Sequence, residues 1–284
     1  KGVAMGIRIV IDSSSDVTKE IIEKYNIVMV PLVVNFEDGS YLDKVELTTE
    51  EFFQKLSQSE KLPTTSQASP MDFVQAFKKI LDEWDEVLGI FIGADFSGTY
   101  QSAVIAKEML GDDRIHLIDS RSACLGTFAI VLKAIELIEQ NKDIKEIVDI
   151  LEEVKYKVEI AVGIDTLKYL LKGGRLSKTQ AIAGSLLNIK PIITVKDSKI
   201  LVLDKVRGNN NVLKWMDNWI STNNFDLSHK TVLLFHARAQ ERIDALRKML
   251  EEKYGVKNII ESEVGAVIGT HTGPGVVAMG FLND

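Results

Sequence analysis

The sequence predicts an α/β protein of two domains, the first built on a mostly parallel sheet and the second of the α+β type. The chain has 284 residues, which is more than one hydrophobic core usually serves. Over residues 7–158, β-branched apolar runs alternate with helix-period runs, a pattern typical of parallel strands covered by helices. A hairpin pattern interrupts this alternation later in the chain, so we place the second domain at residues 159–284.

In the first domain, short apolar runs predict strands and amphipathic runs predict helices. Asp16 or a neighbouring serine is expected to cap the first helix. Thr48 with Glu51, and Ser69 before Pro70, are typical helix starts. The predicted strands are residues 7–11, 27–34, 86–92 and 114–119. The predicted helices are residues 18–25, 52–56, 73–84, 102–110, 128–139 and 144–156, and residues 62–70 form a loop.

The second domain contains a hairpin and several alternating strands and helices. Asp197 and Ser198 separate two β-branched runs and predict the hairpin turn. Gly173 and Gly174 predict a helix end, followed by a new N-cap at Ser177. The predicted strands are residues 159–163, 190–195, 199–203, 231–236, 257–263 and 276–281. The predicted helices are residues 166–171, 180–188, 210–220 and 240–253, and residues 270–275 form a loop.

Composition excludes several classes of function. The formal net charge is −7 and no basic stripe is present, so a nucleic-acid-binding surface or a DNA-binding regulator is not expected. No apolar run reaches the ~18 residues that a membrane span needs, and no secretory pattern precedes the first strand. Cys124 is the single cysteine, which excludes a disulfide framework and a thiolate metal site. We therefore expect a cytoplasmic protein without stable membrane insertion.

The stretch 93–100 joins an apolar strand to a helix. We expect Ser97, Gly98 and Thr99 in the first turn of that helix. Such a turn exposes unpaired backbone N–H groups and the positive end of the helix dipole. Small residues let an anion approach these groups, so the stretch predicts an anion site.

Ser97 has an alternative interpretation as a nucleophile. His271 would be its base, and Asp12 or Asp95 would orient the imidazole. The nucleophile elbow G-x-S-x-G requires glycine where this chain has Asp95, so the spacing does not support the triad. A serine esterase using Ser97 and His271 remains the alternative hypothesis.

Two further loops contain polar residues that turn formation does not require. Thr64, Thr65 and Ser66 are consecutive hydroxyl residues with no helix to cap directly. His271 lies among glycines, where backbone can approach a ligand and the imidazole can donate a hydrogen bond. The other histidines lie in strand patterns or a polar loop, so no metal site is expected. Neither glycine-rich nucleotide motif is present.

One basic cluster stands out in this acidic chain. It is either a solvated face or a docking patch for an acidic or phosphate-bearing partner. Its members are Lys172, Arg175, Lys178, Lys205 and Arg207.

Six motifs in order resemble the DegV family of fatty-acid-binding proteins, which includes the FakB subunits of bacterial fatty acid kinases. The resemblance extends from about residue 7 to residue 282. The motifs are Asp12-Ser13-Ser14-Ser15-Asp16, Thr65-Ser66-Gln67, Phe96-Ser97-Gly98-Thr99-Tyr100, Lys172-Gly173-Gly174-Arg175-Leu176-Ser177, Lys205-Val206-Arg207-Gly208 and His271-Thr272-Gly273-Pro274-Gly275. One departure is Ala68, where family members often have proline.

The resemblance implies a non-catalytic protein that holds one long-chain fatty acid between its two domains and needs no metal or other cofactor. It implies that a separate kinase subunit, related to dihydroxyacetone kinase, phosphorylates the bound acid for phospholipid synthesis. The implied ligand-binding residues are Thr65, Ser97, Gly98, His271 and Thr272. The implied contacts with the partner or the transferred phosphoryl group are Arg175 and Arg207.

Elementary energetics agree with a lipid anion. Two hydroxyl donors, an imidazole and a helix start can hold a carboxylate without a formal counter-charge. Burying a C16 tail at ~0.8 kcal/mol per CH₂ contributes on the order of 12 kcal/mol before ordering of the chain is subtracted. The tail would therefore supply most of the affinity, and the polar end would supply orientation.

Overall fold

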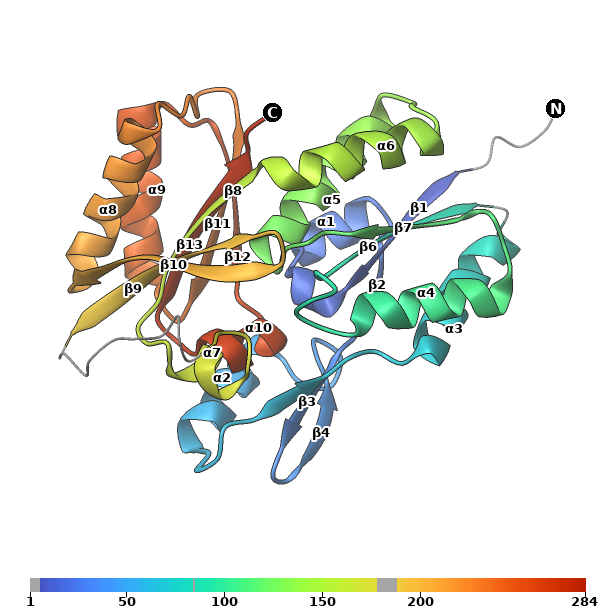
Figure 1. The fold of residues 1–284 in the computed structure, drawn as a ribbon, viewed down its shortest axis with the longest axis horizontal. Helices are drawn as coiled ribbons and strands as arrows, with labels where there is room; N and C mark the ends of the chain where they lie inside the picture. Colours follow the sequence, from blue (N-terminus) through green and yellow to red (C-terminus); the bar gives the residue numbers. More distant parts are fainter. Residues whose placement is uncertain (1–5, 84, 178–187) are drawn as a thin grey trace.

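The computed structural model describes residues 6–83, 85–177 and 188–284 (Figure 1). These residues form a parallel four-stranded sheet, a six-stranded sheet and a small three-stranded sheet. In Figure 1 the six-stranded sheet lies on the left, the parallel sheet on the right and the small sheet below. The predicted fold class is confirmed, since a parallel α/β layer stands beside a separate, sheet-rich part of the chain.

The four-stranded sheet has the order β2-β1-β6-β7, and every neighbouring pair is parallel. Helices cover both of its faces (Figure 1), so the central strands are continuous apolar runs. Its strands are β1 (Ile7–Asp12), β2 (Val28–Val30), β6 (Glu86–Phe91) and β7 (Ile115–Asp119). The helices of this part are α1 (Lys19–Lys24), α3 (Pro70–Asp82), α4 (Thr99–Leu110), α5 (Leu125–Glu139) and α6 (Ile144–Val154), with short 3₁₀ helices at Ser13–Ser15 and Lys155–Lys157.

The six-stranded sheet has the order β10-β9-β8-β13-β11-β12, antiparallel except for the β11–β12 pair. Helices α8 and α9 cover its outer face, and α5 packs on its inner face. Its strands are β8 (Val158–Gly163), β9 (Ile189–Lys196), β10 (Lys199–Arg207), β11 (Thr231–Ala237), β12 (Asn258–Glu263) and β13 (Val276–Leu282). The two covering helices are α8 (Asn209–Thr222) and α9 (Gln240–Tyr254).

The small antiparallel sheet has the order β4-β3-β5. Helix α10 contacts β3, β5, α2 and α7, and so joins this sheet to the six-stranded part of the molecule. The strands are β3 (Val33–Phe36), β4 (Gly39–Leu42) and β5 (Thr64–Ser66). The helices are α2 (Thr49–Gln58), α7 (Lys168–Lys172) and α10 (Ala266–Thr272).

Two strand predictions were wrong. The single strand expected over 27–34 is divided at Pro31, which has no N–H to continue a ladder, and its halves join different sheets. The loop expected over 62–70 contains β5, because Thr65 pairs with Val34 of β3. A three-residue strand is too short to show a period in the sequence, so only its partner reveals it.

Three expectations about helix ends were also wrong. The last three residues of α10, 270–272, were expected to be a loop, since glycines and threonines carry little helical signal. Helix α4 begins at Thr99 with Gly98 as N-cap, so Ser97 lies before the first turn. Thr18 is the N-cap residue of α1, and Asp16 does not cap that helix.

The remaining predicted elements are present with ends shifted by a few residues, including the β9–β10 hairpin and both capping boxes. The predicted helix over 180–188 and Lys178 of the basic cluster fall largely or wholly outside the described residues, as does Trp84. The predicted division of the chain after residue 158 stays a prediction. Over the described ranges, we find no helix long and apolar enough to cross a bilayer.

Candidate functional site

A cavity of about 440 Å³ lies where the carboxyl ends of the parallel strands meet the inner face of the six-stranded sheet and α10. This is within the usual size range of small-molecule sites, roughly 300–1,000 Å³. Its wall is mostly aliphatic and aromatic, which favours an apolar ligand. The apolar lining includes Leu32, Ile92, Leu125, Ile160, Val162, Ile193, Phe235, Val267, Val276 and Ala278.

Two of the predicted site residues are in direct contact. Thr65 of β5 and His271 near the end of α10 share a hydrogen bond of 2.8 Å between Oγ1 and Nε2. The other imidazole nitrogen, Nδ1, is buried and has no hydrogen-bond partner among the residues that the structure describes. Because a buried orphan N–H is costlier than a buried orphan lone pair, we assign the proton to Nε2. His271 then donates to Thr65, whose own hydroxyl proton is free to point at a ligand.

The imidazole of His271 is neutral at physiological pH. Burial, and to a smaller extent the positive charge of Arg175, together lower its pKa from 6.5 to about 4. Protonation would create a second N–H at the unpartnered Nδ1. Neutral His271 is therefore a hydrogen-bond donor to Thr65 and carries no charge that could attract an anion.

This depressed pKa predicts a pH dependence of folding. Between pH 6.5 and about 4, unfolded chains bind a proton at His271 that the folded protein does not, so the residue's stabilisation is lost as the pH falls. His271→Gln lacks this group, so its free energy of unfolding should rise relative to that of wild type as the pH falls. The expected rise is up to ~1.4 kcal/mol per pH unit between pH 6.5 and about 4. Urea denaturation at several pH values measures the difference. Exposed His229→Gln is the control, and equal pH slopes for His271→Gln and wild type would contradict the assignment.

The absence of a side chain at Gly173 leaves room for the His271 ring. A Cβ at this position would overlap Nδ1 of His271, although the φ of −75° suits any residue. The neighbouring Gly174 has a φ of +73°, and a Cβ there would meet no other atom of the described residues within 4 Å. Gly173 is therefore required for steric reasons, and Gly174 for its left-handed backbone conformation.

Alanine substitutions separate these requirements. Gly173→Ala is expected to displace the imidazole and break its bond to Thr65, which would move the Cε1–H NMR signal of His271. Gly174→Ala is expected to lower the free energy of unfolding by about 1 kcal/mol and leave that signal in place. An unmoved His271 signal in Gly173→Ala would show that the ring tolerates the added methyl group.

Ser97 and Gly98 line the same cavity from the connection between β6 and α4. The Ser97 hydroxyl accepts a hydrogen bond from the Thr99 amide at 3.2 Å and shares another with the Thr99 hydroxyl at 2.8 Å. A Cβ at Gly98 would overlap the amide of Gln67, which donates to Ser102 at 2.9 Å. Gln67 was not predicted as a site residue, although it belongs to the motif that contains Thr65.

Arg175 connects the two sides of the cavity. Its Nε and Nη2 atoms donate to the Phe96 carbonyl at 3.2 and 3.0 Å, and Nη1 donates to the Gly173 carbonyl at 2.6 Å. The same side chain borders a surface pocket of about 530 Å³ that also contains Asp95 and Lys199. Arg175 thus stands between the cavity and the exterior.

The other two predicted residues are placed differently. Thr272 lines the cavity, and its hydroxyl donates to the Ile268 carbonyl at 3.1 Å within α10. Arg207 is exposed at the end of β10 and does not line the cavity. Six of the seven predicted site residues therefore lie at the cavity wall, and the seventh, Arg207, lies elsewhere.

The geometry gives no support to the esterase alternative. The Ser97 hydroxyl contacts Thr99, whereas Nε2 of His271 contacts Thr65. Nδ1 of His271 has no carboxylate to orient it, and Asp12 is bonded to backbone amides elsewhere. A triad requires a nucleophile–base bond and a base–orienter bond, and neither is present among these residues.

Comparison with known proteins agrees with these observations. The model of a family described as uncharacterised protein, DegV family, matches residues 6–284. A DegV domain-containing protein of Caldanaerobacter subterraneus subsp. tengcongensis is 39% identical over 275 residues, which are 97% of this chain and 98% of that protein.

Two solved structures have the same fold. A DegV family protein from Thermus thermophilus, described as binding fatty acid, superposes with a TM-score of 0.91 at 31% identity, covering 98% of this chain and 99% of that one. A stearic acid-binding protein from Eubacterium ventriosum superposes with a TM-score of 0.87 at 27% identity, covering 96% and 97%. Sequence, cavity and fold therefore agree that this chain belongs to the DegV family.

Proposed function

We propose that this protein binds a long-chain fatty acid in the cavity and presents its carboxylate to a separate fatty acid kinase subunit, which forms the acyl phosphate. The observation that carries the proposal is the two-part chemistry of the cavity, an apolar wall together with a hydrogen-bonded hydroxyl–imidazole pair and a guanidinium group. A fatty acid has the same two parts. The relatives from Thermus thermophilus and Eubacterium ventriosum, described as binding fatty acid and stearic acid, support this choice of ligand.

In this proposal, Thr65 and Ser97 donate hydrogen bonds to the carboxylate. Neutral His271 holds the Thr65 hydroxyl in its donor orientation, because Nε2–H already fills the acceptor side of Oγ1. Gly98 lies in the cavity wall at the start of α4, where the Gln67 amide packs against it, and Arg175 supplies the positive charge. Thr272 completes the wall next to His271.

In this proposal the protein is the non-catalytic, lipid-binding subunit of the kinase system. The partner, a subunit related to dihydroxyacetone kinase, brings ATP, and the carboxylate of the ligand is the acceptor. Arg175 borders both the cavity and the surface pocket, so the head of the ligand lies within reach of a docked partner. Arg207 is a second, exposed contact for that partner. We take the cavity to lie between domains at residues 7–158 and 159–284.

Native mass spectrometry tests the first half of the proposal. Protein purified from bacteria is expected to carry one bound mass in the fatty-acid range, and delipidated protein is expected to bind one stearate. A protein that is empty as purified and also rejects stearate and palmitate would disprove fatty-acid binding.

A reconstituted reaction tests the second half. Stearate-loaded protein, ATP and the kinase subunit are expected to yield acyl phosphate, captured as the hydroxamate, and omission of either protein should abolish the product. Product without the kinase would show that this chain is itself catalytic. Labelling of Ser97 by a fluorophosphonate would instead favour the esterase alternative.

A further inference from the structure

The Asp12–Asp16 segment has no role in the proposed site, yet all five of its residues are almost fully buried. Their exposed fractions lie between 0% and 1%, although two are carboxylates and three are hydroxyls. Buried polar groups are destabilising unless they are partnered, so their partners indicate what the segment does. Capping of α1 does not explain this burial, because Thr18 is the N-cap residue of that helix. Asp12 caps only the short 3₁₀ helix Ser13–Ser15.

The first partner is the connection that carries Ser97. The Asp12 carboxylate accepts a hydrogen bond from the Ile92 amide at 2.8 Å, immediately after β6. Ile92 lines the cavity, and the chain runs from it directly to Ser97. The second Asp12 oxygen accepts from the Ser14 amide at 3.0 Å, which fixes the carboxylate in place. Asp12 therefore determines where the Ser97 connection leaves the parallel sheet.

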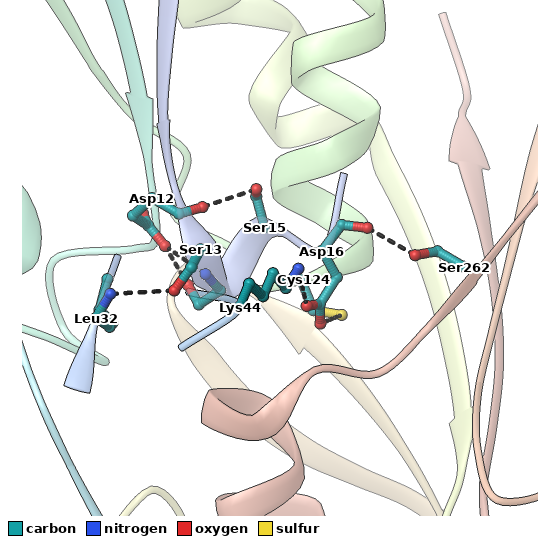
Figure 2. Close-up of polar contacts among 9 residues, drawn as sticks. Asp12, Ser13, Ser15, Asp16, Leu32, Lys44, Cys124 and Ser262 are labelled. Atoms are coloured by element: carbon teal, nitrogen blue, oxygen red, sulfur yellow. Dashed lines mark hydrogen bonds and ion pairs between the residues drawn. The ribbon is translucent and has the colours of Figure 1, made fainter. Parts of the chain in front are cut away.

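The second partner is the strand that carries the neighbour of Thr65. The Ser13 hydroxyl accepts a hydrogen bond from the Leu32 amide at 3.1 Å, just after the chain turns at Pro31 (Figure 2). Two residues later, Val34 pairs with Thr65 in the β3–β5 ladder. Ser13 thus fixes the start of the strand against which Thr65 is aligned.

The third partner is the helix that carries His271. The Asp16 carbonyl accepts from the Ser262 hydroxyl at 2.7 Å, near the end of β12 (Figure 2). The Asp16 carboxylate lies against Gly265, the N-cap residue of α10, where a Cβ would overlap it. Helix α10 is only seven residues long, so a shift at its start is carried to His271 near its end.

Charge pairing holds Asp16 in this position. One carboxylate oxygen lies 2.7 Å from Nζ of Lys44, and the other accepts from the thiol of Cys124 at 3.2 Å (Figure 2). The Asp16 side chain is 1% exposed and that of Lys44 is 23% exposed. A buried ion pair adds little to stability compared with apolar residues of the same volume, but it fixes geometry.

We infer that the Asp12–Asp16 segment, with Lys44, positions the three chain segments that carry Ser97, Thr65 and His271, and so holds the head-group donors in register. This inference rests on the proposed function of those donors. The residues of the segment are positioning residues, since Asp12, Ser13 and Asp16 act through Ile92, Leu32 and α10 rather than on the ligand. Neither the segment nor Lys44 lines the cavity, whereas three of their neighbours do, namely Leu32, Ile92 and Cys124.

Two variants test the inference, and neither leaves one member of the Asp16–Lys44 ion pair without the other. Ser13→Ala removes the acceptor for Leu32, and Asp16→Asn/Lys44→Met removes both charges of the ion pair together. In ligand-free protein, both are expected to move the Cε1–H NMR signal of His271 and to shift its pKa toward the ordinary value. This readout needs no ligand, so it tests positioning even if fatty-acid binding were disproved.

Binding of myristate, palmitate and stearate provides the second readout. Both variants are expected to weaken all three acids by the same factor, about tenfold, because the head-group contacts are affected and the tail contacts are not. The control is Leu246→Ala, in the core between α9 and the outer face of the six-stranded sheet, which should lower the unfolding midpoint and leave affinity unchanged.

Three outcomes would overturn the inference. The first is an unmoved His271 signal with wild-type affinity in both variants. The second is an affinity loss that differs between the three acids. The third is an equal loss in Leu246→Ala, since this would show that general destabilisation is sufficient. If wild-type protein binds none of the acids while the His271 signal moves as expected, the proposed function fails and the positioning role stands.

Discussion

Ala278→Phe is expected to weaken binding of stearate roughly 100-fold or more while leaving the fold intact. Ala278 lies on β13, is 4% exposed and lines the cavity, so a phenyl ring there extends into the space that a ligand tail would fill. Displacing about four methylenes at ~0.8 kcal/mol each corresponds to a loss of affinity of roughly 100-fold or more. Acids of ten to twelve carbons (roughly the length that still fits) should bind as they do to wild type.

The same sheet offers a matched control. Ala161 lies on the adjacent strand β8 and belongs to the core cluster formed with α8 and α9, on the opposite face from Ala278. Ala161→Phe is expected to lower the free energy of unfolding by about 1–3 kcal/mol, as overpacking of a filled core does, whereas Ala278→Phe is not. Isothermal titration with a series of chain lengths and urea denaturation measure both effects. Unchanged stearate affinity in Ala278→Phe would place the ligand outside this cavity.

Replacement of the hydroxyl donors is the second large effect that we expect. Ser97→Ala and Thr65→Val each remove one hydrogen bond to a carboxylate, which corresponds to about 1.5–3 kcal/mol, or roughly 10- to 100-fold in affinity. The double variant should lose less than the product of the single losses if the two donors share one ligand group. Displacement of a fluorescent fatty acid measures the affinity, and hydroxamate capture with the kinase measures presentation of the carboxylate.

Ser120→Ala is the control for these variants. Ser120 follows β7, the neighbour of the strand that leads to Ser97, and its buried hydroxyl bonds to the Ser122 carbonyl at 3.1 Å and to Thr127 at 3.0 Å. It does not line the cavity, so its loss should reduce stability alone. Full affinity and full acyl-phosphate formation in the Ser97/Thr65 double variant would remove both residues from the proposed head-group site.

Much of the candidate site could be predicted from the sequence because its residues lie in loops that are unusually rich in hydroxyls and glycine. Thr65, Ser97 and His271 were all identified in this way, and the structure brings each of them to one cavity. Gln67 was missed because an exposed glutamine in a polar loop has no distinctive local signal, and its contact with Gly98 exists only in the folded chain. Arg207 was grouped with Arg175 because both are basic. Charge does not indicate distance in the folded chain, and of the two only Arg175 lines the cavity.

The apolar periods of the sequence by themselves determined the parallel layer, the hairpin and the order of the long strands and helices, since these patterns are local and extend over many residues. Only the tertiary structure decided the short elements. Residues 64–66 became a strand because β3 lies beside them, and residues 266–272 became a helix because α2, α7 and the small sheet surround them. From the sequence, the Asp16 carboxylate could cap a helix or form an ion pair. In the folded chain it is buried against Gly265 of α10 and pairs with Lys44. Contacts between residues far apart in the chain carry no local signal, and such contacts fix the tautomer of His271 and the shape of the cavity.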